Sequence, residues 1–256
     1  MKKRNNYRHL QIKKMPNPRK ITAISLFVFG LLLLATIVFA GQAATVTHLS
    51  GPLAVRKADG AIKAISIGSK IEEGDTVVTE KRTYCRLKFS DGSEVTMKPN
   101  SHFKVEKYNY EHAKPKYDSA SFNLIKGGLR TITGQIGKRG NLDSYQMKTP
   151  TAVIGIRGTI YDAHFCQGDS CGAIKPGLYL AVTNGTVVIT NSAGLQTTLQ
   201  VKAGQYVYVQ SSATPPVVLP SKPDIPFTPP PSVGSGAAGS QQSAGGSSGS
   251  TDCQVR

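Results

Sequence analysis

Two patterns of apolar positions divide the chain. Residues 21–40 form an apolar run of twenty residues without a charge, whereas most of residues 44–211 consists of short runs in which apolar and polar residues alternate. An apolar run of about 20 residues is long enough for a helix across the ~30 Å hydrocarbon core of a bilayer. Alternation with a period of two is typical of half-buried β-strands. The pattern therefore predicts one hydrophobic N-terminal helix followed by an all-β domain.

The predicted strands are rich in Val, Ile, Thr, Tyr and Phe and are bounded by Gly, Asn and Asp. They are Thr45–Leu49, Leu53–Lys57, Asp75–Val78, Arg86–Phe89, Glu94–Met97, His102–Lys107, Ser121–Ile125, Gly128–Thr133, Tyr145–Lys148, Thr159–Phe165, Leu178–Val182, Gly185–Thr190, Gln196–Val201 and Gln205–Val209. Asp91-Gly92 and Asn184-Gly185 supply the positive φ that tight hairpin turns need, and Lys126-Gly127-Gly128 is a similar turn signal. Many short strands with regular turns predict a jelly-roll-like β-sandwich.

The composition changes after residue 211. Eight of the fifteen prolines lie within residues 215–231, and Ser, Gly, Ala and Gln dominate residues 232–251. Proline-rich segments form extended spacers, and a segment with few apolar residues has too little surface to bury to offset the entropy of ordering. We therefore expect residues 212–256 to be a disordered tail, first Pro-rich and then Ser/Gly-rich.

The positive charge is concentrated at the N-terminus. Residues 1–20 hold eight basic residues and no acidic residue, which is half of the net charge of +16. Because basic flanks stay in the cytoplasm, we expect residues 44 onward on the periplasmic or extracellular face. Residues 21–43 are either a cleaved signal peptide or a retained inner-membrane anchor, and both alternatives stay open. Residues 21–40 are the expected membrane contact.

The cysteines indicate one short disulfide bond. Cys166 and Cys171 bracket a turn-like Gln-Gly-Asp-Ser segment, and an oxidising compartment favours a bond between them. Such a bond stabilises the fold by about 2 kcal/mol on the chain-entropy account. Cys85 lies in a strand-like run and is expected to be a small buried apolar residue. Cys253 lies in the tail, where it is assigned no role.

One predicted strand carries groups that are capable of chemistry. Asp162, His164 and Cys166 alternate along it, so their side chains are expected on one face. A carboxylate, an imidazole and a thiol suit a metal site or an activated thiol, but no further His has the spacing of a ligand set, and Cys166 is the better disulfide candidate. The sequence also lacks the common nucleotide-binding, serine-hydrolase and zinc-protease motifs. We therefore expect no catalytic residue, metal or cofactor, with an enzyme that uses these three residues as an alternative.

Two groups of basic residues are candidates for binding a polyanion. They are Lys81, Arg82, Arg86 and Lys88 in the first group, and Lys126, Arg130, Lys138 and Arg139 in the second. No nucleic-acid-binding module accompanies them, so no specific nucleic-acid partner is expected. The basic residues predict a solvated face that prefers anionic neighbours at low salt.

Two ordered blocks of sequence resemble the FecR domain. The first contains Gly74-Asp75 and Asp91-Gly92-Ser93, and the second contains Gly127-Gly128, Thr149-Pro150 and Gly155-Ile156-Arg157-Gly158-Thr159. The resemblance covers roughly residues 70–165, with related strands to about 210, and implies an all-β periplasmic or extracellular module. The best-known members of the family are membrane regulators that relay the state of an outer-membrane iron-siderophore receptor to a cytoplasmic sigma factor.

The chain is expected to differ from those regulators. Their membrane helix follows a cytoplasmic anti-sigma domain, whereas the twenty-residue basic stretch before the apolar run here is expected to be too short to build a core. The resemblance is therefore to the free-standing secreted or anchored members of the family.

The residues that carry the resemblance are expected to be structural. They are Gly74, Asp75, Asp91, Gly92, Gly128, Pro150, Gly155, Arg157, Gly158 and Thr159. Gly155 and Gly158 permit a positive φ or a close backbone approach. Arg157 lies in an apolar run, so its guanidinium needs partners or a solvent edge. We expect it to clamp a carboxylate or carbonyl of the fold, with a ligand contact as the alternative.

The sequence thus predicts a non-enzymatic extracytoplasmic module that binds a protein partner or an envelope polymer. Open strand edges are the expected mode of contact, because an edge accepts a further strand. The alternatives are a membrane signal-transduction regulator related to iron-siderophore sensing and a polyanion-binding surface protein.

Overall fold

A computed structural model describes residues 41–139, 142–172, 174–194 and 196–234. The predicted apolar helix at residues 21–40 and the Ser/Gly-rich part of the predicted tail from residue 235 lie outside these ranges. The chain divides into two units, Met1–Phe39 and Ala40–Arg256, and all described residues belong to the second. No helix within the described ranges has the length and apolar character needed to cross a membrane.

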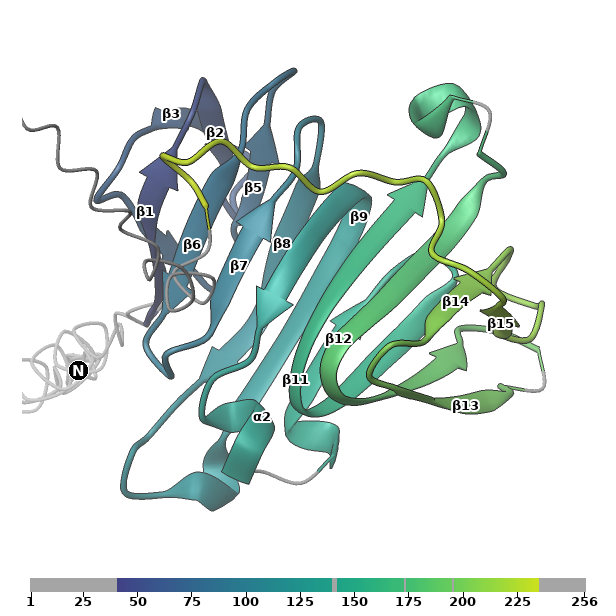
Figure 1. Ribbon diagram of the computed structural model, residues 1–256. Helices are drawn as coiled ribbons and strands as arrows, with labels where there is room; N and C mark the ends of the chain where they lie inside the picture. Colours follow the sequence, from purple (N-terminus) through teal and green to yellow (C-terminus); the bar gives the residue numbers. More distant parts are fainter. Residues whose placement is uncertain (1–40, 140–141, 173, 195, 235–256) are drawn as a thin grey trace, which may run out of the picture. The chain divides into compact units, whose positions relative to one another are not determined.

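Fifteen strands in the described ranges join into one hydrogen-bonded sheet (Figure 1). The strands are β1 (Gln42–Leu49), β2 (Leu53–Arg56), β3 (Ile62–Ile65), β4 (Lys70–Glu72), β5 (Thr76–Thr79), β6 (Cys85–Phe89), β7 (Glu94–Met97), β8 (His102–Asn109), β9 (Ser119–Ile132), β10 (Tyr145–Lys148), β11 (Ala152–Cys166), β12 (Gly177–Asn191), β13 (Thr198–Lys202), β14 (Tyr206–Val209) and β15 (Val217–Leu219). The short helical turns are η1 (Pro115–Tyr117), α2 (Ile136–Arg139), η2 (Leu142–Ser144) and η3 (Gly168–Cys171). The all-β prediction is confirmed, whereas the jelly-roll arrangement stays a prediction.

The three longest strands, β9, β11 and β12, change pairing partners partway along their length. The first part of β9 pairs with β8 and β10, and its second part with β7 and β11. Likewise β11 passes from β10 to β9, and β12 passes from β14 to β13. The changes fall at Gly127, Gly158 and Gly185, whose φ angles are 80°, 59° and 78°. Glycine adopts this left-handed conformation without the Cβ penalty and bends a strand that continues.

These bends correct two predicted turns. Lys126-Gly127-Gly128 and Asn184-Gly185 were expected to end one strand and start another, but they lie inside the continuous strands β9 and β12. The prediction of separate strands was wrong because a hairpin turn and a bend both need a positive φ. By contrast, Asp91-Gly92 does connect two antiparallel strands, β6 and β7.

An aromatic cluster fills part of the core, with Phe122 of β9 at its centre. The Phe122 ring centroid lies 5.0 Å from that of Phe89, 5.3 Å from that of Phe103 and 5.5 Å from that of Tyr145. These distances suit the edge-to-face and offset contacts that aromatic rings prefer. Elsewhere in the core, Cys85 is fully buried, as predicted.

The chain beyond residue 211 differs from the predicted disordered tail. Val217–Leu219 forms β15, which pairs antiparallel with β14. The chain then crosses in front of the sheet toward β1 (Figure 1, yellow). Addition of β15 to the edge of β14 satisfies backbone hydrogen-bonding groups of both strands. The Pro-rich composition of the segment gave no indication of this strand.

Candidate binding face under the C-terminal strap

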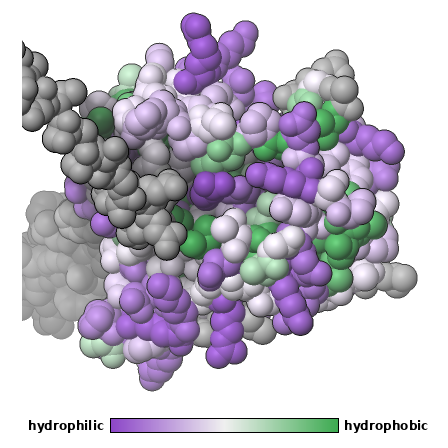
Figure 2. All heavy atoms as spheres, viewed as in Figure 1, coloured by the Kyte–Doolittle hydropathy of each residue, from purple (hydrophilic) through white to green (hydrophobic). Residues whose placement is uncertain are grey.

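Residues 220–234, here called the strap, lie extended on one face of the sheet. From residue 222 to residue 228 the exposure alternates: Pro223, Ile225 and Phe227 are half-buried, and the residues between them are exposed. An alternation of two is what an extended chain shows when one of its sides lies on a surface. Figure 2 shows that this side of the molecule mixes hydrophilic side chains with smaller apolar patches.

Two apolar residues anchor the strap to the strands beneath it. The Phe227 ring lies 4.3 Å from the Arg130 guanidinium carbon and 6.3 Å from the Tyr84 ring centroid in an edge-on arrangement. Val233 is completely buried, and its carbonyl accepts a hydrogen bond from Nη2 of Arg86, a buried residue of β6. The cation–π contact and the buried hydrogen bond hold the strap against the sheet.

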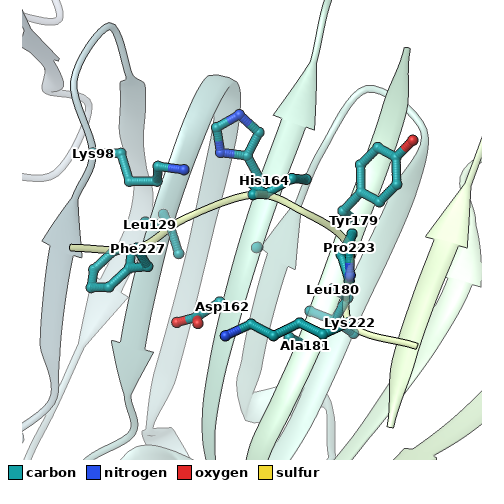
Figure 3. A pocket seen from close by; sticks show the side chains of 12 residues that line it. Lys98, Leu129, Asp162, His164, Tyr179, Leu180, Ala181, Lys222, Pro223 and Phe227 are labelled. Atoms are coloured by element: carbon teal, nitrogen blue, oxygen red, sulfur yellow. The ribbon is translucent and has the colours of Figure 1, made fainter. Parts of the chain in front are cut away.

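A small pocket lies between the strap and strands β11 and β12 (Figure 3). Its volume is about 30 Å³. The strap contributes Lys222, Pro223, Ile225 and Phe227, and the sheet contributes Lys98, Leu129, Asp162, Ala163, His164, Tyr179, Leu180 and Ala181. The predicted placement of Asp162 and His164 on one face is correct, because both line this pocket.

Asp162 is held by an arginine from the neighbouring strand. Arg130 of β9 donates from Nε and Nη2 to the two carboxylate oxygens of Asp162, at 2.6 and 2.8 Å. These hydrogen bonds raise the pKa of Arg130 above its ordinary value. Because Arg130 also contacts Phe227, one guanidinium joins the carboxylate of the sheet to the ring of the strap.

His164 and Lys98 lie together in the pocket wall, with the Lys98 side chain extending toward the imidazole (Figure 3). Burial, and to a smaller extent the charge of Lys98, lower the pKa of His164 to about 3, so the ring is neutral at pH 7. Burial also lowers the pKa of Lys98 to about 8, against the opposing effect of Asp162. The His164 Nδ1 atom is buried and has no hydrogen-bond partner among the described residues.

Cys166 and Cys171 form the predicted disulfide bond. The Nε2 atom of His164 lies 3.0 Å from the Cys171 sulfur. His164, Cys166 and Cys171 place their nitrogen and sulfur atoms within 4.8 Å of one another. A cysteine binds a metal as its thiolate, however, and the two sulfurs are bonded to each other, so these residues do not fit a metal in this state. The trio of Asp162, His164 and Cys166 is therefore divided between an ion pair, a buried neutral ring and a disulfide.

Gly74 and Asp75, from the first block of the FecR-like motif, make a buried turn. Gly74 has a φ of 90°, and Asp75 is 1% exposed. The Asp75 carboxylate accepts from Lys57 Nζ and from the Glu72 backbone, both at 2.9 Å. These contacts hold the turn in place, and the structural role of the pair stays a prediction.

Asp91 and Gly92 fasten the β6–β7 hairpin to α2. Gly92 has a φ of 83°. The Asp91 Oδ1 atom accepts from the Ser93 backbone at 3.0 Å, and Oδ2 accepts from the Ile136 backbone at 3.2 Å. A carboxylate at this place satisfies free N–H groups at the start of α2.

The second block holds backbone segments close together. Gly128 leaves room for the His164 ring, because a Cβ there would collide with Nδ1. The carbonyl of Pro150 accepts from the Ser192 hydroxyl at 3.2 Å. Gly155 pairs with Val188 within the sheet.

Gly158 and Thr159 shape the bend of β11. The φ of Gly158 is 59°, a positive value, which is one of the two roles that were expected of this glycine. Buried Thr159 donates its backbone N–H to the Thr133 hydroxyl at 2.7 Å and its own hydroxyl to the Thr186 carbonyl at 2.9 Å.

Arg157 does not clamp the fold as predicted. Its side chain is exposed on β11, opposite Thr186, and it makes no hydrogen bond or ion pair with the described residues. Side chains alternate between the two faces of a strand, and Arg157 lies on the solvent-facing side. The apolar residues around it in the sequence therefore do not indicate that it is buried. The arginines that clamp the fold are others, including Arg86 and Arg130.

Some residues of the two predicted polyanion-binding groups make contacts within the fold. Arg86 and Arg130 hold the strap, and Arg139 donates to the buried carboxylate of Asp118 at 2.9 Å. Lys88 and Lys138 are exposed, as a solvated face predicts.

Sequence reasoning missed the strap, Lys98 and the clamping role of Arg86. One signal was present in the strap, because Pro223, Ile225 and Phe227 occupy alternate positions and are followed by an isolated Val233. The prolines between them concealed this period-two pattern.

The comparison with family models agrees with the resemblance of the motifs. The sequence model described as FecR protein matches residues 75–188. Two crystal structures of a candidate anti-sigma factor from Parabacteroides distasonis ATCC 8503 align with a TM-score of 0.43 and 12% identity, over 56% of this chain and 58% of that chain. A cell surface anchoring domain aligns with a TM-score of 0.24 and 26% identity, over 24% of this chain and 82% of that domain. No curated protein matches the sequence. The ordered motifs and the family match show a FecR domain at residues 75–188 of the chain.

Proposed function

We propose that this protein is a non-enzymatic, extracytoplasmic FecR-domain module that binds a protein partner through an extended segment of that partner. The binding face is the sheet surface now covered by the strap. In this proposal the strap is an intramolecular ligand that a partner segment replaces.

The observation that carries the proposal is an extended polypeptide already seated on the face. The chain first adds β15 to the edge of β14, and then lays alternate strap residues onto the sheet. Strand addition combined with pockets for alternate side chains is a recurring mode of peptide recognition. A partner segment with apolar residues at the spacing of Ile225, Phe227 and Val233 meets the same contacts.

The chemistry of the face supports binding rather than catalysis. Asp162 is paired with Arg130, and Cys166 is bonded to Cys171. The lowered pKa of His164 makes its ring a poor base near pH 7. Each group that the sequence offered as a catalyst is thus engaged in holding the fold.

Two observations support the extracytoplasmic location. Disulfide bonds such as Cys166–Cys171 persist mainly in oxidising compartments. FecR domains are typically periplasmic or associated with the cell envelope.

A peptide titration tests the proposal on the full-length protein. A labelled peptide with the sequence of residues 220–234 is added to the wild type and to a strap-weakened variant that combines Phe227→Ala with Val233→Ala. We expect at least tenfold tighter binding to the variant, because the wild-type strap competes at a high effective concentration. Fluorescence anisotropy measures both affinities.

Controls separate recognition from loss of structure. A peptide that carries both alanine substitutions should not bind, and a protein with Val217→Ala and Val218→Ala, which are exposed on β15, should behave as the wild type. Phe227→Leu is a milder second variant that removes the ring contact with Arg130. Absence of saturable binding to a variant with a native circular dichroism spectrum would overturn the proposal.

A second candidate function is signal transduction across the membrane, because the FecR domain relates the chain to membrane regulators of that kind. It requires that residues 21–40 stay attached as an anchor. Intact mass and membrane fractionation test it in a Gram-negative host. A full-length, membrane-bound species supports the relay, whereas a soluble species that starts at Gly41 or Ala44 excludes it and leaves a free binding module.

A further inference from the structure

A second hollow, distinct from the pocket under the strap, is lined by two lysines. Its volume is about 270 Å³, and its lining residues are Lys81, Pro99, Asn100, Lys126, Gly127 and His164. His164 is the residue that it shares with the pocket under the strap. Among the described residues that line it, none is acidic.

The two lysines are not neutralised by the fold. Neither Lys81 nor Lys126 makes an ion pair or a side-chain hydrogen bond within the described part of the chain. Glu80 is an acidic neighbour of this region, but it is exposed and does not line the hollow. Unpaired ammonium groups that share one concave surface produce a positive potential that concentrates anions.

The backbone around the hollow is fixed before any ligand arrives. The Asn100 N–H donates to the Glu80 carbonyl at 3.3 Å, which ties the β7–β8 turn to the connection that carries Lys81. Fully buried Ser101 accepts from the Gly128 N–H at 2.9 Å and donates to the Gly128 carbonyl at 3.0 Å, next to Lys126 and Gly127. These bonds bring three chain segments together and make the lysine arrangement part of the fold.

The fixed backbone also limits which groups meet a ligand. The N–H groups of Asn100 and Ser101 donate within the protein, to Glu80 and to the Thr79 hydroxyl. The available donors are therefore the ammonium groups of Lys81 and Lys126 and the exposed Asn100 side chain. His164 adds a buried Nδ1 atom without a partner, which lies beside Gly128.

We propose that this hollow is a binding site for a phosphate group, either free or carried by a saccharide. Lysine binds phosphate as a point charge, and a phosphate group on a carrier has a charge of about −1.5 to −2 at pH 7, which two ammonium groups match better than the single charge of a carboxylate. The hollow contains two lysines and no arginine among its described lining residues. Phosphate is therefore the anion that best suits its donors. The site is separate from partner binding under the strap and does not depend on it.

NMR titration of the full-length protein tests the site with four compounds. The compounds are inorganic phosphate, glucose 6-phosphate, galacturonate and glucose, and the amide signals of Asn100 and Gly127 are the readout. We expect saturable shifts with both phosphates, at least tenfold weaker binding of galacturonate and no shift with glucose. Equal affinities for the two phosphates identify free phosphate as sufficient, whereas tighter binding of glucose 6-phosphate identifies a sugar phosphate.

Matched charge variants locate the binding. Lys81→Gln combined with Lys126→Gln should weaken binding of both phosphates at least tenfold. Lys63→Gln combined with Lys107→Gln removes the same charge from exposed lysines elsewhere and should change the affinity less than twofold. The remaining amide signals report whether each variant is folded. Equal weakening in the two double variants, or binding of galacturonate as tight as that of glucose 6-phosphate, would overturn the proposal.

Discussion

The bend at Gly158 and the strap-covered face are held by different kinds of contact. At the bend the contacts join the backbone of Thr159 to the Thr133 hydroxyl: the Thr159 N–H donates to this hydroxyl at 2.7 Å, and the hydroxyl donates to the Thr159 carbonyl at 3.0 Å. At the strap they come from side chains, with Phe227 on Arg130 and Val233 in a buried site.

The two regions also differ in their relation to the family. The bend lies within residues 75–188, which match the FecR family, and the strap lies beyond them. The family match therefore contains the bends at Gly127, Gly158 and Gly185, and a segment outside the match covers one face of the sheet. A partner specific to this chain is best sought at the covered face.

The largest effect is expected where two bent strands touch. Gly185 has a φ of 78°, and a Cβ there would collide with the Gly158 carbonyl. Gly185→Ala should lower the free energy of unfolding by about 3 kcal/mol, because left-handed strain and backbone displacement add. Gly204→Ala, with a φ of 82° and open space around it, should cost about 1 kcal/mol. Urea unfolding measures both, and equal losses would show that the close approach is unimportant.

The second effect concerns His164 on the covered face and depends on pH. The pKa of His164 is about 3 in the folded protein, below the ordinary value of 6.5. Burial is the larger cause of this decrease, and the charge of Lys98 is the smaller one. As the pH falls, the unfolded chain therefore binds a proton at this histidine before the folded protein does. The stability that the folded protein gains from the neutral ring is present above pH 6.5 and is lost as the pH falls toward 3. Between pH 6.5 and 4.5 the wild type should lose about 2 kcal/mol more than His164→Gln. Parallel losses in urea unfolding at both pH values would contradict the buried, neutral ring.

The third prediction compares the ion pair of Arg130 on the covered face with a more exposed ion pair. Arg130→Gln removes the two bonds to Asp162 and the contact with Phe227, and should lower the free energy of unfolding by about 1.5 kcal/mol, since both charges are about one quarter exposed. Lys148→Gln breaks the more exposed pair with Glu106 and should cost about 0.5 kcal/mol. A loss of less than 0.5 kcal/mol for Arg130→Gln would show that the strap does not rely on this arginine.

Local patterns predicted the strands and the disulfide bond well, for a physical reason. Alternation of apolar residues reports burial of one strand face, and the spacing of Cys166 and Cys171 is a local property. The bends at Gly127 and Gly185 were not predictable in the same way, because a bend and a hairpin turn both need a positive φ, and the pairing of the strands in the folded sheet decides between them.

The candidate site was predictable only in part. Asp162 and His164 were placed together by the strand period, and both line the covered pocket. Their surroundings depend on tertiary contacts: Arg130 comes from another strand, and Phe227 comes from a segment whose prolines suggested a free tail. No local pattern distinguishes Arg130, which is clamped, from Arg157, which is exposed.

The smallest effect is expected at Arg157, at the uncovered bend. Because its side chain is exposed and unpaired among the described residues, Arg157→Gln should change the free energy of unfolding by less than about 0.5 kcal/mol. The same substitution should also leave binding of the strap peptide unchanged, since Arg157 does not line the covered pocket. Urea unfolding and the anisotropy titration check the two statements. A loss above 1.5 kcal/mol would support the clamping role that the sequence predicted for Arg157. Unchanged stability with altered peptide binding would instead indicate that the partner contacts the bend rather than the face under the strap.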